Sequence, residues 1–114
     1  MLRYTELYAG ASWIDEYGDP ADPEMREYLA QFSPYHQLSG SLHYPPAFIT
    51  TSLADDRVHP AHALKFYAKL AALQPDTTWL YAPETGGHTG NGTQEQSADE
   101  LACLLAFLRQ TIGS

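Results

Sequence analysis

The sequence predicts an α/β fold with the order β-α-β-α, an irregular helical preface and an incomplete parallel sheet. Two short runs rich in β-branched and aromatic residues, at 48–52 and 77–81, are typical of buried strands. An amphipathic stretch at 60–73 separates them, and a strand–helix–strand unit places its strands parallel with a right-handed crossover. Parallel sheets are normally larger than two strands and covered on both faces, so we expect this sheet to lack neighbours.

The preface begins with residues 1–10, which show neither a clear hydrophobic period nor a capping signal. Ser12 follows, and its side chain is of the type that caps a helix N-terminus. We therefore expect a short helix over 13–17. Gly18 would end it, because glycine readily adopts the left-handed conformation found after helix C-termini.

Asp22 and Pro23 predict the start of a second helix, over 24–32. An aspartate at the N-cap accepts hydrogen bonds from the first free N–H groups, and proline fits the first helical turn. Residues 34–46 are rich in turn-forming types and are expected to form a loop before the first strand.

The last predicted helix begins at Thr93 or at Ser97, where Ser97 and Glu100 have the spacing of a capping box. A glycine-rich loop, 82–92, leads into it from the second strand. The apolar stripe of this helix comprises Leu101, Leu104, Leu105, Leu108 and Ile112.

The charge composition disfavours several classes of partner. The chain has 6 basic and 14 acidic residues, a net charge of −8, so it offers no basic patch for nucleic acid. It has no apolar run long enough to cross a membrane and no signal-peptide pattern at its start. These features leave the compartment open between cytoplasm and periplasm, and no cofactor motif is present.

An acid and a histidine follow the two predicted strands. Asp55 comes just after the first strand, and His88 lies in the glycine-flanked loop after the second. Because open α/β sheets place their chemistry at the carboxyl ends of parallel strands, this order resembles the second half of a Ser…Asp…His triad. A G-x-S-x-G nucleophile motif is absent from the 114 residues, and Ser12 does not fit one. The alternative is a helix-capping acid and a solvated loop histidine.

Two further sets of residues are weaker candidates. His59 and His62 follow two aspartates, but this spacing lacks the paired signature of most zinc sites, so we expect no metal. Cys103 lies within the apolar stretch of the last helix and is interpreted as an inert small hydrophobe. As the only cysteine, it has no internal disulfide partner.

Motifs spread over almost the whole chain resemble one family. They are, in chain order, MLRY (1–4), GASWIDEYG (10–18), SPYH (33–36), YPP (44–46), ADDRVHP (54–60) and GGH (86–88). Together they are similar to the last part of the catalytic domain of prolyl oligopeptidases, which are serine peptidases of the α/β-hydrolase fold. The resemblance implies that residues 1–114 are the C-terminal portion of that fold, without its nucleophile elbow and N-terminal propeller.

The resemblance also implies roles for individual residues. Asp55 matches the triad aspartate, His88 the triad histidine, and Arg57 an arginine that contacts a substrate carbonyl. The residues that match the lining of the pocket for the substrate proline are Trp13, Tyr17 and Val58. Without the resemblance, Trp13 and Tyr17 on one helical face would be interpreted as core packing, and Arg57 as a surface ion pair.

Two functions follow as hypotheses. In the first, the chain is part of a proline-specific serine peptidase and supplies aspartate and histidine but not serine. In the second, it is a non-catalytic unit that folds by association. Because the 48–52 strand would have an open edge, we expect a homodimer or larger assembly through it.

Overall fold

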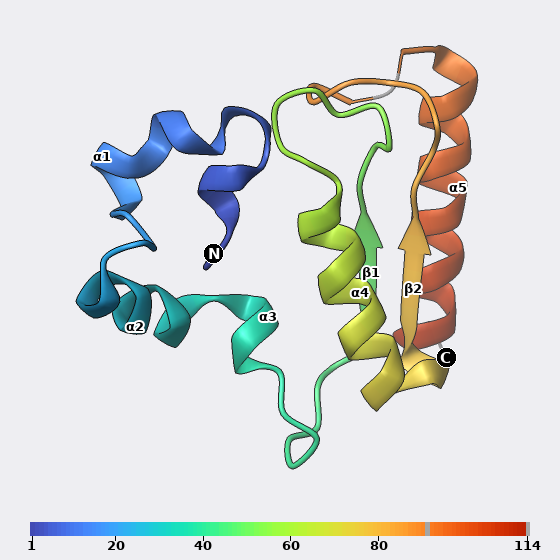
Figure 1. The fold of residues 1–114 in the computed structure, drawn as a ribbon. Helices are drawn as coiled ribbons and strands as arrows, with labels where there is room; N and C mark the ends of the chain where they lie inside the picture. The colour runs from blue at the N-terminus through green and yellow to red at the C-terminus, as the bar shows by residue number, and fades with distance from the viewer. Residues whose placement is uncertain (91, 114) are drawn as a thin grey trace.

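A computed structural model describes residues 1–90 and 92–113 (Figure 1). It contains short 3₁₀ helices, labelled η, as well as α-helices and strands. The elements in chain order are η1 (Tyr4–Glu6), η2 (Tyr8–Trp13), α1 (Ile14–Tyr17), α2 (Pro23–Phe32), α3 (Pro34–Gln37), β1 (Ala47–Thr50), α4 (Ala61–Leu73), η3 (Pro75–Thr77), β2 (Thr78–Tyr81) and α5 (Gln94–Thr111).

The two strands pair in parallel, and Phe48 lies opposite Trp79 in the register. Backbone pairing continues beyond the strands, because the Leu53 N–H donates to the Pro83 carbonyl at 2.9 Å. This pairing keeps the loops that follow β1 and β2 side by side at one end of the sheet (Figure 1). The predicted α/β order and the small parallel sheet are confirmed.

Helices α4 and α5 cover opposite faces of the sheet (Figure 1). On the α5 face, Phe107 stacks on Phe48 with ring centroids 5.6 Å apart and meets Trp79 edge-on at 5.3 Å. Side chains alternate between the faces of a strand, so the neighbouring residues Ile49 and Leu80 point toward α4. The sheet is thus the middle layer of an α/β/α arrangement.

The starts of α2 and α5 follow predicted capping signals. The Asp22 side chain accepts from the N–H groups of Glu24 and Met25, as predicted for α2. The sequence allowed α5 to begin at Thr93 or at Ser97, and the start at Thr93 is confirmed. Thr93 caps α5 by accepting from the Gln96 N–H at 3.2 Å, one turn before Ser97, and the four residues from 93 to 96 have the same capping-box spacing.

Two local expectations are wrong. Ser12 does not cap α1, because its hydroxyl donates back to the Ala9 carbonyl at 2.6 Å inside η2. The 34–46 stretch is not a loop throughout, since α3 occupies its start. Pro34 fits the first turn of α3, and the carbonyl of the buried Ser33 accepts from the N–H groups of the following turn.

Tyr4 anchors the preface. Its side chain is only 2% exposed, its hydroxyl donates to the Gly18 carbonyl at 2.8 Å, and its ring meets Tyr17 edge-on. Gly10 passes so close that an added Cβ would lie 1.8 Å from the Tyr4 carbonyl oxygen, which excludes any larger residue there. These contacts fix α1, and with it Tyr17 and Trp13, relative to the chain start.

The chain exposes more surface than a self-contained domain of its size. Its accessible surface is 7632 Å², whereas monomers of this mass expose about 6,200 Å². Its radius of gyration is 16.0 Å, against about 13 Å for a compact chain of this length. The large exposed apolar residues of α5 are Leu101, Leu104 and Leu105, and the exposed Ile112 follows the helix directly.

Cys103 on the same helix is exposed as well, and its interpretation as an inert small hydrophobe stays a prediction. Within residues 1–90 and 92–113, β1 and β2 pair only with each other, which leaves an open edge on β1. Association through that edge stays a prediction.

None of the helices described here has both the length and the apolar character needed to cross a membrane.

Candidate functional site

The loops after β1 and β2 bring Asp55 and His88 together. The Asp55 Oδ2 and the His88 Nδ1 lie 3.1 Å apart, although the residues are 33 positions apart in the sequence. The acid is mostly buried, with 13% of its side chain exposed, while 37% of the histidine side chain is exposed. The strand order indicated this pairing, with a helix-capping acid and a solvated histidine as the alternative, and the family resemblance implied it.

The backbone after Asp55 orients its carboxylate. Oδ1 accepts hydrogen bonds from the N–H groups of Arg57 and Val58, both at 2.9 Å, which leaves Oδ2 facing His88. Burial alone would raise the pKa of Asp55. The two backbone N–H donors and the contact with His88 more than offset burial, so the pKa lies below its ordinary value. The carboxylate therefore stays ionised at neutral pH.

His88 stands at the tip of a narrow turn. Gly87 and Gly90 exchange backbone hydrogen bonds of 3.1 and 3.2 Å, and Gly90 has a φ of 111° that favours glycine. Because a carboxylate only accepts hydrogen bonds, the His88 Nδ1 carries the proton that points at Asp55. The other ring nitrogen, Nε2, is left as an acceptor that can take a proton from a reacting group.

An open cavity of about 360 Å³ adjoins His88. All four residues that the sequence analysis assigned to substrate binding line it, so the fold brings them to one place. The lining residues are Trp13, Glu16, Tyr17, Arg57, Val58 and His88. Glu16 was not among the predicted site residues, although Trp13 and Glu16 are three residues apart across the η2–α1 junction, a spacing that places helical residues on one face.

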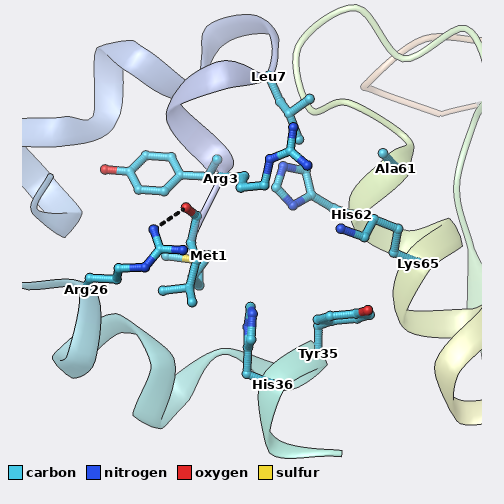
Figure 2. A pocket seen from close by; sticks show the side chains of 11 residues that line it. Met1, Arg3, Leu7, Arg26, Tyr35, His36, Ala61, His62 and Lys65 are labelled. Carbon is cyan, nitrogen blue, oxygen red and sulfur yellow. Dashed lines mark hydrogen bonds between the residues drawn. The ribbon is translucent and has the colours of Figure 1, made fainter. Parts of the chain in front are cut away.

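A second cavity, of about 140 Å³, lies between the preface and α4 (Figure 2). No acid lines it, and its basic lining side chains are Arg3, Arg26, His36, His62 and Lys65. Burial, and then nearby positive charges, lower the pKa values of His36 and His62. Neither Asp55 nor His88 lines this cavity, so the acid–histidine pair acts elsewhere.

The remaining candidates have structural partners. The His59 Nδ1 accepts from the Ala61 N–H at 3.0 Å, and its ring packs on Tyr8 with centroids 4.4 Å apart. Within residues 1–90 and 92–113, no three histidine, cysteine or acidic side chains are grouped to hold a metal ion. His59 thus has a helix-starting role.

Comparison with known proteins gives consistent matches over the chain. A model of the prolyl oligopeptidase family matches residues 1–114. The prolyl endopeptidase of Elizabethkingia miricola is 40% identical over 116 residues, which cover 99% of this chain and 16% of that protein. The solved post-proline cleaving enzyme of Rickettsia typhi is 33% identical with a TM-score of 0.85, covering 98% of this chain and 16% of that one.

A further solved structure, from a mechanistic study of two prolyl endopeptidases, superposes with a TM-score of 0.89 at 34% identity. The superposed region covers 97% of this chain and 17% of the solved chain. The chain therefore spans about one sixth of the length of the curated relatives that it matches.

Proposed function

This chain belongs to the prolyl oligopeptidase family, and we propose that it supplies the aspartate and histidine of a serine peptidase that cleaves after proline. The observation that carries the proposal is the 3.1 Å contact between Asp55 and His88 beside the cavity lined by Trp13 and Tyr17. We call the protein in which this segment acts together with a nucleophilic serine from another segment the complete enzyme.

In the proposed reaction, the His88 Nε2 accepts the proton of the serine hydroxyl as the serine oxygen attacks the carbonyl carbon of the scissile bond. The resulting imidazolium is stabilised by the ionised Asp55 carboxylate. It then protonates the leaving amine as the peptide C–N bond breaks, which leaves an acyl-enzyme. A water molecule, deprotonated by the same nitrogen, releases the product acid and regenerates the serine.

The cavity residues fit recognition of the substrate proline. The flat indole of Trp13 offers a face on which a pyrrolidine ring stacks, and Tyr17 and Val58 close the sides of the same cavity. The Arg57 side chain is exposed, and its guanidinium has no hydrogen bond or ion pair with any described residue. It is therefore available to donate to a substrate carbonyl.

Replacing Trp13 with alanine should weaken proline selectivity. We expect kcat/KM for a proline substrate to fall about tenfold or more, and that for the matched alanine substrate to fall less, because the variant removes pocket contact rather than proton transfer. Tyr28→Ala is the control, since Tyr28 is an exposed aromatic on α2 outside this cavity. Equal losses on both substrates would assign Trp13 to packing instead.

The function is tested by comparing the purified 114-residue chain with the complete enzyme on a peptide that releases a chromophore after proline. We expect turnover by the complete enzyme and only background hydrolysis by the chain, because losing the nucleophile of a triad removes nearly all of its chemical advantage. Enzyme-level turnover by the chain alone would contradict the proposed division of the triad.

The exposed leucines of α5 and the open edge of β1 favour a second candidate, an associating unit without activity of its own. The two candidates differ in what is encoded immediately upstream of Met1. An in-frame G-x-S-x-G segment supports the peptidase, whereas a nearby stop codon supports the non-catalytic unit.

A further inference from the structure

Ser52 joins the two loops that carry the acid and the histidine. It follows β1 directly, and its hydroxyl donates to the backbone carbonyls of Gly86 at 3.1 Å and Thr85 at 3.3 Å. The same oxygen accepts from the Ala54 N–H at 3.1 Å. Its backbone carbonyl also accepts from the Asp55 N–H at 3.2 Å. One residue thus contacts the acid loop and the histidine loop.

Other contacts between these loops are few. Apart from the Asp55–His88 pair itself, the Ser52 hydroxyl makes the side-chain hydrogen bonds that cross between residues 52–59 and the described part of 82–92. The backbone bond from Leu53 to Pro83 lies nearer the sheet and farther along the chain from His88. Ser52 is therefore the side chain that sets the separation of the loops close to the histidine turn.

The far side of the histidine loop is held separately. The Gln96 side chain on α5 donates to the Thr85 hydroxyl and accepts from the Gly92 N–H at 3.1 Å. It therefore binds the histidine loop both before and after His88. Gln96 fixes the loop to the helix but not to Asp55. Removing the Ser52 hydroxyl would leave the loop anchored to α5 and free to shift relative to the carboxylate.

We propose that Ser52 is a positioning residue that holds the His88 turn at hydrogen-bonding distance from Asp55. The proposal rests on the proposed function, because it concerns the geometry of the same pair. Gly86, which accepts the hydrogen bond, has a φ of 93°, so the hydroxyl ties down the backbone at a turn that only glycine adopts readily.

The test uses three variants of the complete enzyme. Ser52→Ala removes the hydroxyl, Ser52→Thr retains it, and Ser39→Ala is the matched control. Ser39 is also a half-buried serine that bonds within its own loop, to the Ser41 hydroxyl at 2.8 Å, but it lies in the segment before β1. Each variant is assayed for kcat and KM on the proline substrate, and the ring N–H proton of His88 is followed by low-field NMR.

We expect Ser52→Ala to lower kcat about tenfold or more with KM within about twofold, because small displacements of a reacting group reduce the rate steeply. The low-field resonance should broaden through faster exchange with water in Ser52→Ala and stay sharp in Ser52→Thr and Ser39→Ala. A loss of stability alone would change the amount of folded enzyme and leave this resonance sharp.

Two results would overturn the proposal: a wild-type kcat and resonance in folded Ser52→Ala, or equal losses in Ser52→Ala and Ser52→Thr. Failure of the proposed function appears differently, as retained activity in His88→Ala. A wild-type Ser52→Ala enzyme whose His88→Ala variant is inactive would therefore reject the positioning role and keep the peptidase.

Discussion

Replacing His88 with alanine in the complete enzyme is expected to lower kcat by about 10⁶-fold, because the members of a triad act as one unit. Without the imidazole, no group at this site can take the serine proton and return it to the leaving amine. KM should change little, since the ring contributes one wall of the cavity and leaves Trp13 and Tyr17 in place.

His43→Ala is the matched control for this variant. His43 is an exposed histidine in the loop before β1, at the opposite end of the strand from Asp55. Steady-state kinetics on the proline substrate should give wild-type values for it. A His88→Ala enzyme within tenfold of wild type would reject His88 as the general base.

Asp55→Asn is expected to lower kcat by about 10⁴-fold while keeping the fold. The asparagine oxygen can still accept from the Arg57 and Val58 N–H groups, which turns the side-chain NH₂ toward His88. An amide donor forces the His88 Nδ1 to accept. The ring proton then moves to Nε2, which can no longer take a proton from the serine.

The adjacent acid provides the control for Asp55→Asn. Asp56 is exposed and carries the same charge one residue away, so Asp56→Asn changes the net charge equally. Its kcat should stay within about twofold of wild type, because an exposed charge is screened by solvent. If both variants lost activity to the same extent, the effect would come from the overall field and not from the hydrogen bond to His88.

The sequence predicted the features that depend on local chemistry and strand order. The strand–helix–strand unit followed from apolar periodicity, and the α2 start followed from Asp22 and Pro23. The meeting of Asp55 and His88 followed because parallel neighbours end at the same edge of a sheet. The resemblance to the family then assigned Trp13, Tyr17 and Arg57 to the same site, and all three line the cavity beside His88.

The sequence failed where several local signals compete or where tertiary contacts decide. Ser12 has the chemistry of a cap, but the 3₁₀ turn offers its hydroxyl a nearer carbonyl at Ala9. Thr93 and Ser97 were both possible caps for α5, and their order could not be decided without the backbone. Ser52 carried no signal in the sequence, because the positioning role that we propose for it depends on two carbonyls more than thirty residues away.

A fluorophosphonate, which reacts with activated serines, tests whether Asp55 and His88 serve a serine outside these 114 residues. The 114-residue chain and the complete enzyme are labelled under identical conditions and the adducts are located by mass spectrometry. We expect one adduct per complete enzyme, on a serine upstream of Met1, and we expect it to be lost in His88→Ala and absent from the chain alone. A stoichiometric adduct on a serine of the isolated chain would contradict this expectation.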